Sequence, residues 1–400
     1  MVFSGNRMAA LTRLVIVLFV ISSLERTIAE TYECTVGNYG SDKQQHCIFR
    51  NVRYNQNSTN IVFKAPNSDK QPRIVFEDSK MDHLPKEFLE TFGKDLKVLI
   101  VSKCELRSVV ITHALEELHA IDNYITKVIV HQTPQSSPLK EIHLQSNRLK
   151  DISNITKSCK NARIVDLSRN QELADQDTFD LSMFNGFNQL EYLLLADIGA
   201  FYLDNTKNAV LPALTLLDLS MNNLLPSDLR LDRLDGFEKL EVLRLNDNNM
   251  AQLDYALLTG MKSLKTVYLE GNSFDCSYLK TMVKFLNENN IVTPVARPAN
   301  NCDTGFMVEH EMCCKSAQLS HIPKPSPTRP LVPAQANPAP ANPAAPNTPI
   351  LNEVETKPID VVNDNTPVMS ETHPDNGVTN LRVNLLFILT GAIVALVSRD

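Results

Sequence analysis

One pattern of spaced leucines returns through the middle of this chain and constrains its fold more than any other feature. The pattern is L-x-x-L-x-L-x-x-N-x-L, in which Ile, Val, Ala or Phe often replaces Leu, and it is the signature of leucine-rich repeats. Its clearest copies are LKEIHLQSNRL from Leu139, LTLLDLSMNNL from Leu214, LEVLRLNDNNM from Leu240 and LKTVYLEGNSF from Leu264. Weaker copies begin at Leu96, Leu115, Ala162 and Leu190, and an edge copy covers residues 73–84. The pattern predicts eight to nine stacked coils.

Each position of the repeat has a physical role. The L-x-L core predicts a short strand whose alternate side chains point inward, a spacing that an array of amphipathic helices would not produce. The recurring amide falls where the chain leaves the strand and can bond backbone groups that the turn leaves unpaired, at Asn147, Asn222, Asn248 and Asn272. Because one repeat cannot bury its own apolar face, the coils must stack and their ends must be closed. We therefore expect an α/β leucine-rich-repeat solenoid, with repeats over residues 73–275 and a cap at each end.

The cysteines indicate how the caps are held. Most of the eight lie at the two ends of the repeat region and none forms a C-x-x-C pair, which favours extracellular disulfides over a zinc site. We expect a Cys34–Cys47 bridge in an N-terminal cap over residues 30–72. In a C-terminal cap over residues 276–315, we expect an amphipathic helix tied down by a bridge, most simply Cys276–Cys302. Helical spacing predicts that its apolar face consists of Leu279, Met282, Val283 and Leu286. Inside the array, Cys104 at the Asn position of its repeat and Cys159 before a strand are predicted to be structural.

The two ends of the chain differ from the repeats in composition. Two arginines, a short apolar run and a small residue at Ala29 predict a signal peptide over residues 1–29. Residues 316–375 are rich in Pro and Ala, which predicts a disordered stalk. Residues 376–400 contain the apolar run Leu385–Val397, and together they resemble a lipid-anchor signal, with attachment near Asp375 and Asn376. A short membrane span is the alternative, although the apolar run is shorter than a span requires.

Several function classes find no support in the sequence. A net charge of -7 without a basic stripe argues against nucleic acid as a partner. The chain lacks a G-x-S-x-G elbow, a phosphate loop and an H-E-x-x-H motif, and His310 beside the last cysteines has no second His to complete a zinc site. We therefore expect neither an enzyme nor a bound cofactor. Two sequons, at Asn57 and Asn154, predict glycans on a secreted chain.

A column of residues is expected to form the binding surface. The residue between the two strand leucines points onto the concave face, and successive coils place these residues about 4.8 Å apart. Read down the array, the column is Ile100, His119, His143, Asp166, Leu194, Asp218, Arg244 and Tyr268. Its mixture of charges and an aromatic residue favours a protein partner, and six members are candidate binding residues: His119, His143, Asp166, Asp218, Arg244 and Tyr268. A solvated face with the binding surface elsewhere is the alternative.

Three consecutive members of this column have side chains that can ligate a metal. His119, His143 and Asp166 have a spacing that could hold a divalent ion or respond to mild acid. Three polar residues in a row on an exposed sheet also occur by chance. We therefore assign no metal from the sequence.

The ensemble of features resembles a known family. The signal peptide, the cysteine-flanked start, the repeats, the NSFDC cap and the adjacent cysteines in EMCCK are similar to the LRIM family, the leucine-rich-repeat immune proteins of mosquitoes. The likeness covers roughly residues 30–315. It implies an innate immune factor that pairs with another leucine-rich-repeat chain through disulfides and holds a complement-like thioester protein in solution. No heptads follow residue 315, so we expect this chain to be a member that lacks the family's coiled coil and the partner contacts that need it.

The adjacent cysteines lead to a prediction about assembly. Neighbouring cysteines bridge each other only through a strained ring, so the pair more often reaches two different partners. With the cap bridges assigned as above, Cys313 or Cys314 is expected to bond another chain, and the resemblance points the same way. The alternative is that one of them takes Cys276 or Cys302 and the chain stays monomeric. Two functions remain, an immune recognition protein and a cell-surface adhesion receptor or co-receptor.

Overall fold

A computed structural model describes residues 29–316, except residues 42, 56–57, 59–60, 67–71, 132–136, 175, 226–228 and 230. The predicted signal peptide, stalk and hydrophobic C-terminus lie outside these residues, and so do Asn57, Asp375 and Asn376. Within the described part of the chain, no helix combines the length and the apolar composition that crossing a membrane requires.

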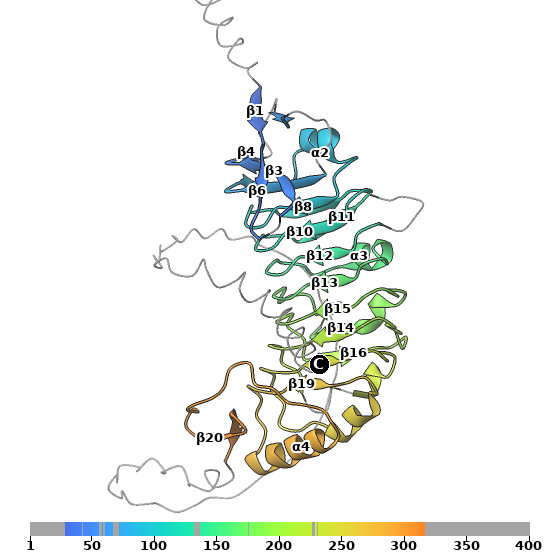
Figure 1. The fold of residues 1–400 in the computed structure, drawn as a ribbon, viewed down its shortest axis with the longest axis vertical. Helices are drawn as coiled ribbons and strands as arrows, with labels where there is room; N and C mark the ends of the chain where they lie inside the picture. Colours follow the sequence, from blue (N-terminus) through green and yellow to red (C-terminus); the bar gives the residue numbers. More distant parts are fainter. Residues whose placement is uncertain are drawn as a thin grey trace, which may run out of the picture. The chain divides into compact units, whose positions relative to one another are not determined.

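The repeats form one long sheet, which confirms the predicted leucine-rich-repeat solenoid (Figure 1). Its eleven strands run in the order β19-β18-β17-β15-β13-β12-β10-β8-β6-β3-β2, and all neighbours are parallel except β2 and β3. The strands are β2 (Thr35–Asn38), β3 (Gln45–Arg50), β6 (Arg73–Glu77), β8 (Val98–Ile100), β10 (Glu117–His119), β12 (Glu141–His143), β13 (Ile164–Asp166), β15 (Tyr192–Leu194), β17 (Leu216–Asp218), β18 (Val242–Arg244) and β19 (Thr266–Tyr268).

Shorter elements complete the coils away from this sheet. Three small parallel sheets pair β1 (Glu30–Glu33) with β5 (Ile61–Lys64), β9 (Ser108–Ile111) with β11 (Lys127–Val130), and β14 (Thr178–Asp180) with β16 (Tyr202–Asp204). A further pair joins β4 (Arg53–Tyr54) and β7 (Lys80–Met81). The helical segments are α2 (Lys86–Phe92), α3 (Ser153–Ser158), η1 (Leu181–Phe184), η2 (Leu231–Leu234) and η3 (Tyr255–Gly260).

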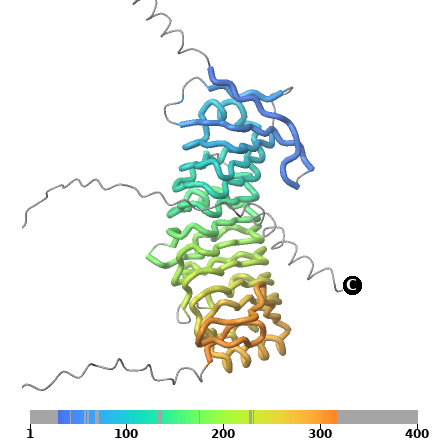
Figure 2. Tube along the Cα trace, turned by 90° about the vertical axis from the view of Figure 1, so that its left-hand side faces the viewer, coloured from blue at the N-terminus to red at the C-terminus, as the bar shows by residue number. Residues whose placement is uncertain are grey.

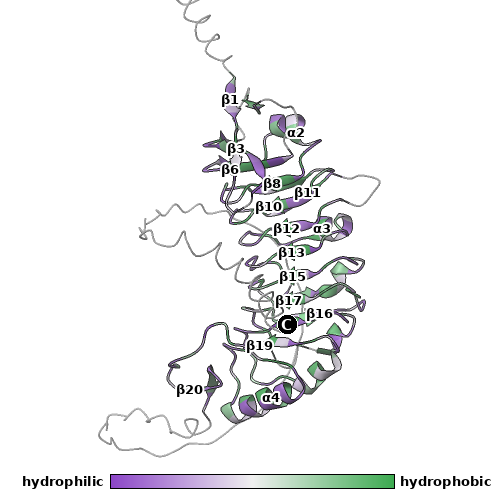
Figure 3. Ribbon diagram, in the orientation of Figure 1, coloured by the Kyte–Doolittle hydropathy of each residue, from purple (hydrophilic) through white to green (hydrophobic). Residues whose placement is uncertain are grey.

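Alternation along each three-residue strand separates core from surface. In the long sheet, the central residue of each strand from β8 to β19 is buried without exposed area, as at Leu118, Leu193 and Leu243. Side chains alternate across a strand, so the first and third residues lie on the opposite face, away from the core. Polar and apolar segments accordingly alternate within each coil (Figure 3). Buried residues from Cys34 to Cys314 belong to one continuous core, as stacked coils require.

A ladder of buried asparagines joins consecutive coils. Asn147 donates from Nδ2 to the Ala120 and Leu144 carbonyls, both at 2.9 Å, and its Oδ1 accepts from Ile125 N at 2.9 Å. The same arrangement recurs at all the predicted positions and also at two weaker copies of the repeat, namely Asn123, Asn147, Asn170, Asn222, Asn248 and Asn272. Each amide thus satisfies backbone groups that the turn would otherwise bury unpaired.

The long sheet begins earlier in the sequence than expected, within the N-terminal cap. β2 and β3 form an antiparallel pair closed by the predicted Cys34–Cys47 disulfide. β3 then pairs in parallel with β6, so a strand predicted to belong to the cap is already a rung of the sheet. Aromatic rings fill the core beneath it, with Phe49 and Phe76 stacked at 5.4 Å.

The C-terminal cap contains the expected helix but different disulfides. Helix α4 (Cys276–Glu288) starts at Asp275, whose carboxylate accepts from Ser277 N and Tyr278 N. Its inward face is the predicted one, formed by Leu279, Met282, Val283 and Leu286, all buried. The helix and the orange segments that follow lie at the end of the stacked coils (Figure 2).

The predicted Cys276–Cys302 bridge is wrong. An antiparallel hairpin of β20 (Phe306–Glu309) and β21 (Met312–Lys315) carries the adjacent cysteines, and Cys276 bonds Cys314 while Cys302 bonds Cys313. Consecutive strand residues point to opposite faces, so Cys314 is directed to the core and Cys313 to the outer loop. The pair reaches two partners as expected, but both are in the same chain. The predicted bond to a second chain through these cysteines is therefore contradicted too.

Candidate protein-binding face

The predicted column exists and runs in register across eight strands. Its members are the third residues of the long-sheet strands β8, β10, β12, β13, β15, β17, β18 and β19, and each is paired directly with the next member on the neighbouring strand. We call this set the third-position column: Ile100, His119, His143, Asp166, Leu194, Asp218, Arg244 and Tyr268. Most members are partly or largely buried by their neighbours, which makes the surface a packed one.

The last three coils contribute a row of three interacting side chains. Arg244 Nη1 lies 3.5 Å from Asp218 Oδ2, and the Arg244 guanidinium carbon lies 5.1 Å from the centre of the Tyr268 ring. The Asp218 carboxylate also accepts from the backbone N and the Oγ of Ser220. The side chains of Asp218 and Arg244 are only 9% and 18% exposed, so their ion pair is less screened than an ordinary surface pair.

Two histidines stack in the first coils of the same column. The rings of His119 and His143 are nearly parallel, with centroids 4.4 Å apart. His143 Nε2 lies 3.5 Å from Glu141 Oε2. The interaction with His143 holds the pKa of the Glu141 carboxyl below its ordinary value, against the opposing effect of burial. These three side chains form one cluster on two adjacent strands.

Asp166 is the next member of the column but has a separate environment. It is in register with His143, yet its Oδ1 accepts from Ser168 N at 3.0 Å. Burial raises the pKa of Asp166, although the hydrogen bond from Ser168 and the nearby His143 oppose this effect. The predicted trio of His119, His143 and Asp166 is thus a row in register, whereas the compact cluster has Glu141 as its carboxylate.

The first residues of the strands form a second column that sequence reasoning missed. They lie on the same face as the third residues, because a strand repeats every two residues. Glu117 and Glu141 are the members that stand beside the stacked histidines. The repeated spacing Glu-x-His in Glu117-Leu118-His119 and Glu141-Ile142-His143 was the available signal.

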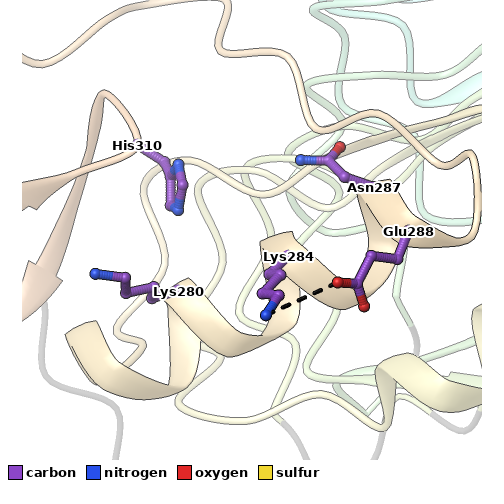
Figure 4. A pocket seen from close by; sticks show the side chains of 5 residues that line it. All are labelled: Lys280, Lys284, Asn287, Glu288 and His310. Atoms are coloured by element: carbon purple, nitrogen blue, oxygen red, sulfur yellow. Dashed lines mark ion pairs between the residues drawn. The ribbon is translucent and has the colours of Figure 1, made fainter.

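A wide-open pocket of about 490 Å³ lies apart from this face, between α4 and the β20–β21 hairpin (Figure 4). It is lined by Lys280, Lys284, Asn287, Glu288 and His310, and Lys284 pairs with Glu288 at 3.8 Å. Two lysines on the exposed side of a helix are typical of a solvated face. We assign no ligand to this pocket.

The remaining predicted sites have mixed outcomes. Asn154 is exposed at the start of α3, and its Nδ2 donates to the Val128 carbonyl at 2.9 Å. Its glycan stays a prediction. Cys104 and Cys159 are buried free thiols, and burial raises their pKa to about 12 and about 11. Such thiols are unreactive, in agreement with a structural role.

Comparisons with known proteins give limited matches. No family model matches the chain. A tubulin-specific chaperone E from Rattus norvegicus is 27% identical over 148 residues, which are 35% of this chain and 28% of that protein. The chain therefore spans little more than a quarter of the curated relative that it matches.

Solved structures with some similarity are leucine-rich-repeat proteins. A complex of LRIM1 and APL1C is 18% identical with a TM-score of 0.41, over 72% of this chain and 71% of that one. The repeat domain of APL1B is 24% identical with a TM-score of 0.46, over 66% of this chain and 72% of that one.

Proposed function

We propose that this chain is an extracellular, non-catalytic binding module whose third-position column contacts another protein. The observation that carries the proposal is Arg244 held between the Asp218 carboxylate and the Tyr268 ring. Arginine and tyrosine are enriched among residues that dominate binding energy, and a guanidinium already fixed by two neighbours loses little conformational freedom on binding. Three disulfides fit a chain that folds in an oxidising compartment.

The sequence resemblance directs this proposal to innate immunity. The LRIM-type features suggest a second leucine-rich-repeat chain or a complement-like protein as the partner. In the solved complex named above, LRIM1 is assembled with APL1C, and a similar pairing is the first to test. Six of the eight cysteines are bonded within this chain and the other two are buried. We therefore expect the repeat region to hold its partner without a covalent bond.

Affinity purification tests the proposal directly. The tagged full-length chain should recover a leucine-rich-repeat or complement-like protein from the native extracellular fluid. Because no covalent bond is expected, denaturant without reductant should be enough to dissociate the complex. Recovery of the same proteins by a variant that carries Arg244→Ala and Tyr268→Ala would contradict the proposed surface. A variant with Arg148→Ala and Tyr124→Ala is the matched control, because it removes a similar cation–π contact, at 4.6 Å, from outside the strands.

A cell-surface adhesion receptor or co-receptor is the second candidate function. The predicted stalk and hydrophobic C-terminus favour it, with a lipid anchor near Asp375 and Asn376 as the expected attachment. Phosphatidylinositol-specific phospholipase should then release the chain from intact cells. Retention after this treatment, with the hydrophobic tail still present by mass spectrometry, would favour a membrane span.

A further inference from the structure

The stacked histidines and Glu141 form a cluster with the geometry of a metal site. One nitrogen of each histidine and one oxygen of Glu141 all lie within 4.8 Å of one another. The three residues come from two adjacent strands, β10 and β12, in which His119 and His143 are directly paired (Figure 1). Their backbones are therefore fixed by the sheet. Convergence of the three ligand atoms on one ion then depends on side-chain rotations.

His143 provides a second, independent indication of a ligand. The residue is only 5% exposed, and within the described part of the chain its Nδ1 is buried without a hydrogen-bond partner. Its other nitrogen lies 3.5 Å from the Glu141 carboxylate. Buried polar atoms are rarely left unpaired, because each loses its bonds to water. A metal ion ligated by Nδ1 would satisfy this atom.

We propose that His119, Glu141 and His143 bind one divalent transition-metal ion of the Zn²⁺ type. Imidazole nitrogen and carboxylate oxygen suit this class, with ligand distances of about 2.0–2.2 Å. The parallel rings must turn toward each other, because the lone pairs lie in the ring planes. His119 and Glu141 are partly exposed, so the ion's remaining position is open to water.

The charges around the cluster favour a cation. Glu117 precedes His119 on β10, and Asp166 is in register with His143 on the next strand. Together with Glu141, these residues place three carboxyl groups beside two imidazoles. Two basic side chains lie nearby. Arg73 Nη1 lies 3.9 Å from Glu117 Oε2, and Arg163, which interacts electrostatically with Glu141, also forms an ion pair with Glu191 at 2.9 Å.

Calorimetric titration of the full-length, chelator-treated chain with ZnCl₂ tests the site. We expect one ion bound per chain, with binding lost in both His119→Gln and His143→Gln and weakened at least tenfold in Glu141→Gln. The matched control is His113→Gln, which removes an exposed histidine elsewhere in the repeats and should leave binding unchanged. Zn²⁺ should raise the thermal unfolding midpoint of the wild type and of this control, whereas Mg²⁺ should not.

Two results would overturn the proposal. One is a wild-type chain that binds no Zn²⁺ in the calorimeter. The other is stoichiometric binding that persists in His119→Gln, which would place the ion elsewhere on the chain. Because His119 is half-buried and Glu141 is partly exposed, their variants should keep the metal-free unfolding midpoint of the wild type. Binding should also weaken in acid, since protonated imidazole cannot ligate a metal.

Discussion

Cys314 is bonded to Cys276, the first residue of the capping helix, 38 residues earlier in the sequence. The bond fastens the end of the β20–β21 hairpin to the helix that covers the last coil. Cys313, its neighbour, is bonded to Cys302 and closes a much shorter loop of 11 residues. In the unfolded chain, the two bonds therefore constrain loops of different length.

Removal of the disulfide that closes the longer loop should lower the free energy of unfolding more than removal of the other. On the chain-entropy model, Cys276→Ser with Cys314→Ser should lower the free energy of unfolding by about 4 kcal/mol, and Cys302→Ser with Cys313→Ser by about 3 kcal/mol. Urea unfolding of the two double variants measures the difference.

Non-reducing electrophoresis should show the wild type without disulfide-linked dimers. A dimer band that disappears when Cys313 and Cys314 are both serine would contradict the pairing described here.

The two free thiols should be unreactive in the folded protein. With pKa values raised to about 12 and about 11 by burial, Cys104 and Cys159 are almost entirely protonated at pH 8. The thiolate is the reactive species, so a disulfide reagent such as Ellman's should detect no thiol in the native chain and two after denaturation. Cys104→Ser should reduce the second count to one. Rapid labelling of the native chain would show that one of these thiols is accessible.

The asparagine ladder should contribute strongly to stability. Asn248 donates to the Leu219 and Leu245 carbonyls at 3.0 and 3.1 Å and accepts from Leu224 N at 3.1 Å. Asn248→Ala leaves these buried groups unpaired, at about 1–3 kcal/mol each, and should lower the free energy of unfolding by about 3 kcal/mol or more. The exposed Asn249 is the control, and Asn249→Ala should cost less than about 0.5 kcal/mol. Equal effects in urea unfolding would contradict the role of the ladder.

The buried carboxylate of Asp166 should reduce stability at neutral pH. Burial raises its pKa, so the folded state binds a proton more readily than the unfolded state does. Ionised Asp166 therefore lowers the free energy of unfolding most at a pH above its pKa in the folded state. This penalty decreases as the pH falls toward the pKa of the unfolded state. Asp166→Asn should raise the free energy of unfolding at pH 7, and this gain should shrink in acid. Asp235→Asn, at an exposed site, should show neither effect.

Periodicity and spacing predicted most of the fold. The L-x-L repeat predicted the strands of the long sheet from β8 to β19 and their order, and helical spacing predicted the buried face of α4, because both patterns depend on local periodicity. The position of β3 in the sheet was missed, since its segment carries no copy of the repeat. Disulfide partners in the C-terminal cap could not be predicted, because the hairpin that separates Cys313 from Cys314 has no repeat signal.

The binding face was predicted in position and only partly in chemistry. A strand of three residues fixes which side chains share a face, so the column from Ile100 to Tyr268 followed from the pattern. Which neighbours interact depends on rotamers, which the sequence does not contain. The sequence therefore predicted that Arg244 is a charged residue on this face. Its contacts with Asp218 and Tyr268 are seen only in the structure. Glu141 was missed because the first strand position was not considered.

The affinity of the wild-type chain for its purified partner, compared with two matched double variants, tests the central claim most directly. Loss of the Arg244 and Tyr268 side chains should weaken binding by about 2 kcal/mol or more, roughly 30-fold, because both belong to the third-position column. Loss of Arg148 and Tyr124, which form a cation–π contact outside the strands, should change the affinity less than about twofold. Surface plasmon resonance measures all three. Equal affinities for the wild type and the Arg244→Ala, Tyr268→Ala variant would contradict the claim that this face binds the partner.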